Sequence, residues 1–513
     1  MKFSVKLGFV LLLSTCTLFC FFSSCNSKKL AEETKSDLTY AQAEEPNTLD
    51  AARVGETSSA IVAYNIYESL LRFREGTSEI IPCLAVKWWE SENHLSHFFE
   101  LRKDVSFHDN THFDAEAVKF NVERQLGNSQ FPYAESVYGM ISRVEIIDEY
   151  TIEFKLKEIC SYFINNMAMD IGTYIASPQA IKQSYDDDIS SNPVGTGPYE
   201  YVNWKRGQHI KLKRNENYWG EKAKQKNLTF KFIKEPSFRI VALNNGEVDI
   251  AEKIDFALID KVKSSGNVVN ITDMIGTYYL SYNTKKEFLN PQVRCTISSA
   301  INIPELVGSV CNGQLNPANC MLPPGILGRF NNNLSYSFFD PIGAKKFFEK
   351  TKLPKLKILS LSSSEAFGNY LQWAEAIQSY LKKVGVESEI IPYDLKAFKE
   401  KTKNGDFDLC VHSWISDNAD ADNFLNIFSS KNPELNIPKY FNKEIDELFL
   451  RGGQTTNKQQ REAIYTEIEK TLLKDSVVLP LFYIREVSAY QSKISDYVIN
   501  PTGTIRFANI KVL

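Results

Sequence analysis

The strongest constraint on the fold is a short apolar run that leads into a tryptophan and an aspartate. Residues 409–411 read Leu-Cys-Val, follow a turn at Asn404–Gly405, and precede Trp414 and Asp417. An apolar run of this length between turn residues predicts an inner strand of an α/β sheet. Ligands of such sheets lie just beyond the carboxyl ends of the strands. Asp417 is therefore expected where an acidic group can meet a cationic ligand.

Two other interpretations of this acidic loop stay open. Asp417 is followed closely by Asp420 and Asp422, so it can also be a helix N-cap or a turn residue. The same carboxylates can be the acids of a hydrolase. No nucleophile or base stands near them in the sequence, so we expect a protein that is not an enzyme.

Composition excludes several classes of protein. A chain of 513 residues is too long for one core and predicts two or three domains. A net charge of -4 gives no sign of a nucleic-acid partner. Six histidines and the lack of Cys-x-x-Cys, phosphate-loop and Gly-x-Ser-x-Gly motifs predict no metal centre and no cofactor.

The N-terminus has the pattern of an export signal. Lys2 and Lys6 precede an apolar run over residues 7–22, which ends at Ser23-Ser24-Cys25. The cysteine after two serines resembles a bacterial lipoprotein box, which predicts a signal peptide over residues 1–25 and lipidation of Cys25. A plain signal peptide or an uncleaved anchor is the alternative. We expect a periplasmic or extracytoplasmic body, held to a membrane by its N-terminal lipid.

Export also permits disulfides. Cys311 and Cys320 flank a turn-rich segment, so a bridge between them is one interpretation. Such a bridge would contribute about 3 kcal/mol at most by the loop-entropy argument. Two buried thiols are the other interpretation.

Apolar periodicity predicts two lobes rich in strands and helices, with a block of residues 59–186 inserted in the first. Asp114 is predicted to cap a helix over residues 114–125. Pro480 interrupts the apolar run 477–484, which we therefore expect to be a strand end rather than a central strand. The remaining helices are predicted over residues 58–73, 237–244, 291–301, 368–384, 398–402, 443–450 and 459–474.

Several short motifs follow one another along the mature chain. They include Glu45-Pro46-Asn47-Thr48-Leu49-Asp50, Val105-Ser106-Phe107-His108-Asp109, Gly195-Thr196-Gly197-Pro198-Tyr199, Tyr218-Trp219-Gly220 and Gly246-Glu247-Val248-Asp249. Each motif alone is weak. Together and in this order they resemble the extracytoplasmic solute-binding proteins of ABC importers, in the family that takes up oligopeptides, dipeptides and, in some members, nickel.

The resemblance implies an α/β, two-lobe periplasmic-binding-protein fold, a hinged clamshell with an extra domain in the first lobe. Lobe I would comprise residues 26–58, 187–276 and 487–513, with the inserted domain over 59–186, and lobe II would comprise 277–486. The hinge strands would lie near residues 278–283 and 482–490.

The resemblance also implies a ligand site. In that family an aspartate three residues after a tryptophan holds the α-ammonium of an extended peptide, which here are Asp417 and Trp414. The neighbouring candidates for ligand contacts are Ser413, Ile415, His412, Tyr282 and Tyr370. His412 can equally be a core or strand-edge residue.

The function implied is that of the peptide-binding component of an ABC transporter, which delivers peptides to membrane permease subunits and acts as a monomer. The chain departs from the family where basic residues often hold the peptide carboxylate: it has Tyr370, Leu371 and Gln372 at one such place, and Val411 and His412 at the other. Longer, modified or cell-wall peptides therefore stay open. The alternative is the same fold binding a metal chelate, haem or another solute.

Overall fold

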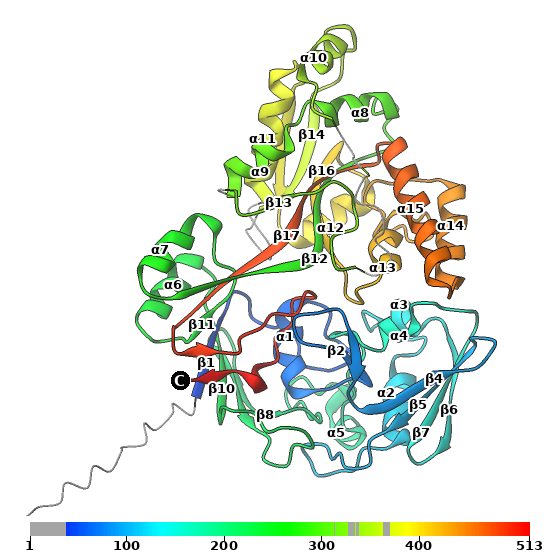
Figure 1. Ribbon diagram of the computed structural model, residues 1–513, viewed down its shortest axis with the longest axis vertical. Coiled ribbons are helices and arrows are strands. Elements are labelled where there is room, and N and C mark those ends of the chain that lie inside the picture. The colour runs from blue at the N-terminus through cyan, green and yellow to red at the C-terminus, as the bar shows by residue number, and fades with distance from the viewer. Residues whose placement is uncertain (1–36, 312, 327–333, 335–337, 363–369) are drawn as a thin grey trace, which may run out of the picture. The chain divides into compact units, whose positions relative to one another are not determined.

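The computed structural model describes residues 37–311, 313–326, 334, 338–362 and 370–513, and its main feature is one mixed sheet of 11 strands. Figure 1 shows this sheet running through the upper and lower halves of the molecule. Its strands lie in the order β15 (Ser388–Tyr393), β14 (Leu356–Leu361), β16 (Leu409–Ile415), β12 (Val268–Tyr282), β17 (Val478–Tyr490), β11 (Ile250–Ala251), β1 (Asp37–Gln42), β10 (Asn227–Phe232), β9 (His209–Arg214) and β8 (Tyr199–Lys205), while β13 (Asn316–Pro317) pairs with β17 off this path.

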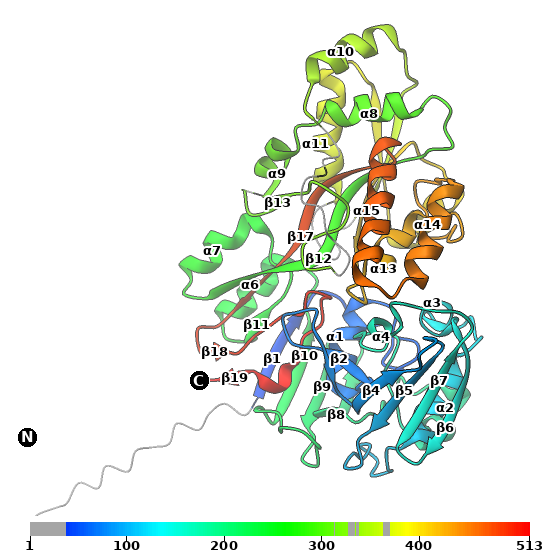
Figure 2. The same ribbon diagram turned by 45° about the vertical axis from the view of Figure 1, so that its right-hand side comes forward.

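Two long strands connect the halves. β12 and β17 pair antiparallel, and their register shifts between Asp273 and Thr277. The predicted lobe boundaries at residues 276/277 and 486/487 fall inside these two strands. Figures 1 and 2 both show the pair crossing from one half to the other, so we call the half with β1 and β8–β11 lobe I and the half with β14–β16 lobe II.

The prediction of a strand end at Pro480 was wrong, because β17 is a central strand that continues to Tyr490. A second register shift explains how the proline fits. Phe482 faces Tyr278 and Pro480 faces Tyr279, so Leu481 is an extra residue in the ladder. A bulge of this kind accepts a residue that has no N–H to donate.

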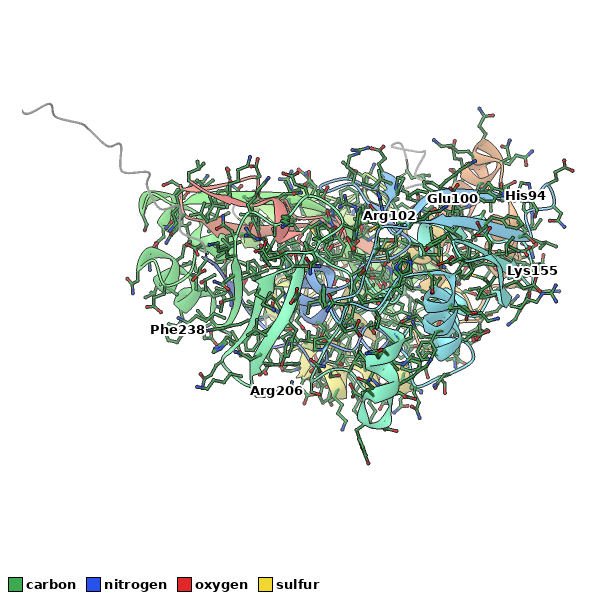
Figure 3. All side chains as sticks on the ribbon, turned by 90° about the horizontal axis from the view of Figure 1, so that it is seen from below. His94, Glu100, Arg102, Lys155, Arg206 and Phe238 are labelled. Carbon is green, nitrogen blue, oxygen red and sulfur yellow. The ribbon has the colours of Figure 1, made fainter. Side chains whose placement is uncertain are left out.

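The inserted block forms a separate antiparallel sheet in lobe I. Its strands lie in the order β4 (Ala85–Glu90), β5 (Ser96–Leu101), β7 (Thr151–Leu156) and β6 (Ile141–Asp148), and a hairpin pairs β2 (Leu71–Phe73) with β3 (Ile80–Pro82). Four helices accompany them: α2 (Ala115–Gln125), α3 (Ala134–Tyr138), α4 (Phe163–Asn166) and α5 (Pro178–Gln183). In Figure 3 the labelled His94, Glu100 and Lys155 lie over this block, on the side away from Arg206 and Phe238.

Helix ends in this block test the sequence predictions. The Asp114 cap is confirmed, because its side chain accepts the Ala117 N–H at 2.9 Å. The helix predicted over 58–73 is too long: α1 spans Thr57–Ile66. The last predicted residues are not helical because residues 71–73 form β2, which pairs with β3.

Lobe II carries most of the helices. They are α8 (Pro291–Ser299), α9 (Ile303–Cys311), α10 (Pro341–Lys350), α11 (Tyr370–Lys383), α12 (Leu395–Asn404), α13 (Ala421–Leu425), α14 (Lys443–Gln454) and α15 (Lys458–Lys474). β14 pairs in parallel with both β15 and β16, as expected of strands joined by helical crossovers. The predicted helices 291–301, 443–450 and 459–474 correspond to α8, α14 and α15 within a few residues.

The C-terminal segment returns to lobe I. The Phe507 N–H donates to Asn65 Oδ1 at 2.9 Å, and Asn65 Nδ2 donates to the Ile505 carbonyl at 2.9 Å. Both bonds are buried on α1, so residues 505–507 are part of the lobe I core.

Of the two interpretations of Cys311 and Cys320, the structure has the second: both residues are buried thiols. The Cys320 sulfur contacts the Leu322 carbonyl at 3.3 Å, and burial raises the pKa of the Cys311 thiol to about 12. The predictions on residues 1–36, including lipidation of Cys25, lie outside the described residues. No helix in the described part of the chain is long and apolar enough to cross a membrane.

Candidate functional site

The strand predicted over residues 409–411 is confirmed and is longer than predicted. β16 runs from Leu409 to Ile415 and pairs antiparallel with β12, where Trp414 faces Thr277 and Ile415 faces Gly276. A Cβ on Gly276 would lie 2.7 Å from Ile415 Cγ1, so only glycine lets the two strands approach here. Asp417 follows two residues after the strand ends, at the level of the β12 bulge.

Asp417 faces lobe I across the junction of the lobes. The Tyr133 hydroxyl, from the start of α3 in the inserted block, donates to Asp417 Oδ2 at 3.4 Å. The Asp417 N–H donates to Asn423 Oδ1 at 3.3 Å, which fixes the loop. Within the described part of the chain, no Lys or Arg forms an ion pair with this carboxylate. Asp417 is thus a partly buried acid without a cationic partner.

The electrostatics of the pair follow from this burial. Burial raises the pKa of Asp417 from 3.8 to about 6, partly opposed by the Tyr133 hydrogen bond. Burial and the Asp417 carboxylate raise the pKa of Tyr133 well above its ordinary value, so its hydroxyl keeps the proton and donates. The Tyr133 ring rests on the backbone of Gly172, which has φ +81° and where a Cβ would lie 2.7 Å from the ring.

Asp420 and Asp422 have internal partners instead. Arg461 on α15 donates to the two Asp420 carboxylate oxygens at 2.7 and 2.5 Å, and Asp420 also caps α13. The Tyr465 hydroxyl donates to Asp422 Oδ1 at 2.9 Å. Burial and Asp420 raise the pKa of Asp422 to about 7, opposed by Arg461 and Tyr465. These carboxylates therefore hold lobe II together rather than forming an acid–base pair at an open site.

The sequence and the fold are both similar to those of known proteins. The sequence profile of the bacterial extracellular solute-binding proteins, family 5 Middle, matches residues 79–436. The chain belongs to this family. Its two-lobe fold is also that of the ABC transporter-associated periplasmic binding protein DppA from Helicobacter pylori, solved in complex with peptide STSA, with a TM-score of 0.82 and 29% identity over 93% of this chain and 98% of that one.

Two curated relatives of this family 5 protein match along nearly their whole length. The dipeptide-binding protein of Escherichia coli is 27% identical over 478 residues, which cover 87% of this chain and 89% of the relative. Heme-binding protein A of Haemophilus influenzae is 27% identical over 526 residues, which cover 96% and 95%.

Four of the predicted site residues lie close together in this family 5 chain. Trp414 is partly buried at the strand end, and its indole Nε1–H has no hydrogen-bond partner among the described residues. Ser413 and Ile415 project to the other face of β16, as neighbours on a strand do. There the Ser413 hydroxyl lies 2.8 Å from the hydroxyl of Tyr370, the first residue of α11.

Tyr282 and His412 have other surroundings. Tyr282 is fully buried at the far end of β12, about 20 Å along the strand from Gly276, and its hydroxyl lies 2.7 Å from Ser298 Oγ. His412 packs between the rings of Tyr279 and Phe398, and burial lowers its pKa to about 4. The structure therefore brings neither to Asp417, and the core interpretation of His412 describes its position.

Sequence reasoning missed the lobe I side of the junction. Tyr133, Asn165 and Asn166 contact lobe II residues at positions 417 and 418, more than 250 residues away in the chain. No local pattern distinguishes these residues, because only the closure of one lobe on the other brings the segments together. In the described ranges no group of His, Cys, Asp and Glu side chains is placed to hold a metal ion.

Proposed function

We propose that this protein is the peptide-binding component of an ABC importer and that Asp417 holds the α-ammonium of the peptide. The observation that carries the proposal is a partly buried carboxylate at the lobe junction that has a tyrosine donor and no cation among the residues that the structure describes. A buried acid without a counter-charge is costly, so it favours a ligand that brings one. The dipeptide and peptide ligands named for the relatives supply such a group.

The surroundings suit an extended peptide. Its ammonium would form charge-assisted hydrogen bonds with Asp417, worth about 1.5–3 kcal/mol. The Trp414 N–H, which has no partner in the described ranges, offers a donor three residues before the acid, and its ring offers a flat apolar wall. Ser413, Ile415 and Tyr370 would line the cleft on the other face of β16. Strand edges at the junction can pair with the peptide backbone, which gives affinity without reading side chains.

The proposal extends to the setting of the protein. It would act as a monomer, attached to a membrane through lipidated Cys25, and present its closed form to permease subunits on the extracytoplasmic face. Closure requires that the ligand contact both lobes, because only a difference in affinity between open and closed forms shifts their balance. Tyr133 of lobe I and Asp417 of lobe II would offer the ligand one contact in each lobe. No catalytic step is part of this function.

The test is calorimetry with di-, tri- and tetrapeptides on the wild type and Asp417→Asn. The variant keeps the shape and loses the charge, so peptide affinity should fall about 10- to 100-fold. Asp260→Asn, an exposed acid on the helix Ile259–Ser264, is the matched control and should leave affinity unchanged. Equal affinity of wild type and Asp417→Asn for every peptide would remove Asp417 from this role.

A haem or a metal chelate is the second candidate ligand. It is favoured by the full-length similarity to Heme-binding protein A. Native mass spectrometry of the protein as purified distinguishes the two, because a retained peptide and a retained porphyrin differ in mass and in visible absorbance. A bound porphyrin that survives Asp417→Asn would favour the second candidate.

A further inference from the structure

Two groups of hydrogen bonds join the inserted block directly to lobe II. The first surrounds Asn418, the residue after Asp417. Asn165 Nδ2 on α4 donates to the Asn418 carbonyl at 3.1 Å, and Asn418 Nδ2 donates to Asn166 Oδ1 at 2.8 Å. All three asparagines are at least nine-tenths buried, so these bonds are shielded from water.

The second group lies at the C-terminal end of α14. The Ser161 N–H donates to the Gly453 carbonyl at 2.7 Å, and its hydroxyl donates to the Gly452 carbonyl at 3.1 Å. Gln454 Nε2 donates to Glu158 Oε2 at 2.8 Å. The last carbonyls of a helix have no partner within it. The Ser161 N–H satisfies the Gly453 carbonyl, while the Gly452 carbonyl also accepts from Arg461 Nε at 3.1 Å. Figures 1 and 2 both show α3 and α4 directly below α13 and α14.

We propose that these two groups form a clasp that keeps the ligand-free protein partly closed and positions Asp417 for its ligand. The proposal rests on the peptide-binding function given above, with the clasp residues acting through Asp417 rather than touching the ligand. Every bond in the clasp joins two groups of the chain itself, so its contribution to closure is independent of which ligand arrives.

The clasp also fixes the Asp417 loop. Asn418 Oδ1 accepts the Asp420 N–H at 3.0 Å, while the Asn418 main chain and amide group are held from lobe I. One side chain therefore connects the loop that carries Asp417, the helix cap at Asp420 and the inserted block. The apparent dissociation constant of a ligand equals its intrinsic value divided by the fraction of protein in the binding-competent state. A larger closed fraction therefore gives tighter binding. The clasp thus sets a common factor in the affinity for all ligands.

The first experiment needs no ligand. The protein is stripped by unfolding and refolding, native mass spectrometry verifies that it is empty, and small-angle X-ray scattering compares it with the profile calculated from this structure. The wild type should contain a substantial closed fraction. Asn165→Asp keeps the side-chain shape but has no N–H to donate, so it should shift the profile toward a more open form. Gln454→Ala, on an exposed helix end, should fold normally and shift it less.

The second experiment is calorimetry with two peptides of different length on the variant Asn165→Asp/Ser161→Ala/Gln454→Ala. One hydrogen bond of ordinary net strength changes an equilibrium about 2- to 12-fold, so three lost bonds should weaken both peptides by about tenfold or more. Both peptides should weaken by the same factor, equal to the loss of closed fraction. Gln459→Ala on α15, an exposed glutamine outside the clasp, is the matched control and should change neither reading.

Three outcomes would overturn the clasp. They are a fully open wild type, clasp variants as compact as the wild type, and a different loss of affinity for each peptide. If no peptide binds at all, the proposed function fails while the scattering result still decides the clasp.

Discussion

Asp417 and Asp420 lie three residues apart in one loop, but their side chains have different partners in the folded chain. Asp420 has a two-pronged contact with Arg461 and caps a helix. Asp417 has a single long hydrogen bond from Tyr133 and no cation among the described residues. The comparison shows that two acids in one loop differ in whether the protein supplies a counter-charge, and this difference is why we propose Asp417 rather than Asp420 as the ligand contact.

The difference has an energetic side. Asp420 and Arg461 are both largely buried, so each is tolerated only because the other is present. Burial by itself would lower the pKa of Arg461, but Asp420 raises it above its ordinary value. Burial raises the pKa of Asp417, which means that the folded protein disfavours its charge. In the proposed function, a ligand ammonium beside Asp417 would remove that penalty, and the site would gain affinity from it.

The largest expected effect is the loss of stability on replacing Asp420. Asp420→Asn keeps the cap but leaves Arg461 as a buried charge without its partner. The free energy of unfolding should fall by about 3–5 kcal/mol. Urea denaturation followed by circular dichroism measures it. A loss below about 1 kcal/mol would mean that the ion pair is not what holds α13 to α15.

Replacing Asp417 should increase the free energy of unfolding rather than decrease it, and the size of the increase should depend on pH. The pKa of Asp417 in the folded protein is raised from 3.8 to about 6, so the folded state binds the proton more tightly than the unfolded chain. Wild-type stability should therefore decrease as pH rises from about 4 to 6, and Asp417→Asn should not show this loss.

At pH 8 Asp417→Asn should thus be more stable than the wild type by at most about 3 kcal/mol, and the gap should close near pH 4. Thermal unfolding of ligand-free protein across this range measures it. Asp260→Asn should show no such gap. A variant less stable than wild type at pH 8 would show that Asp417 has a structural role like that of Asp420.

The smallest effect is expected from the lobe I partner. Tyr133→Phe removes a hydroxyl whose contact with Asp417 is long, 3.4 Å, and keeps the ring on Gly172. Peptide affinity should fall by less than about fivefold. Calorimetry measures it, with the exposed Tyr185→Phe as the matched control. A loss as large as that of Asp417→Asn would move the main ligand contact to lobe I.

The sequence predicted part of this site for clear physical reasons. The apolar run at 409–411 requires burial in a sheet, so the strand and the acid beyond it follow from local pattern. The Asp114 cap follows in the same way from a side chain and its own helix. The bulge around Leu481 could not be predicted in this way, because Pro480 indicates a break in the strand unless its register with β12 is known.

The roles of the three acids in one loop were also beyond the sequence. Asp417, Asp420 and Asp422 have the same side chain and lie within six residues. Their partners are distant in the chain: Tyr133 lies 284 residues before Asp417. Arg461 lies 41 residues after Asp420, and Tyr465 lies 43 residues after Asp422. A side chain acquires its electrostatic role from what the folded chain places against it. For the same reason the sequence could not place Tyr282 against Ser298 or His412 against the ring of Tyr279.

The sequence by itself determined the α/β pattern, the strand that ends at the acidic loop and the family to which the chain is similar, because these depend on the order and periodicity of neighbouring residues. Tertiary structure alone decided which carboxylate is paired, where the two lobes touch, and that Cys311 and Cys320 are thiols. Those properties depend on distances and desolvation between segments far apart in the chain, and both are set only when the folded chain brings those segments together.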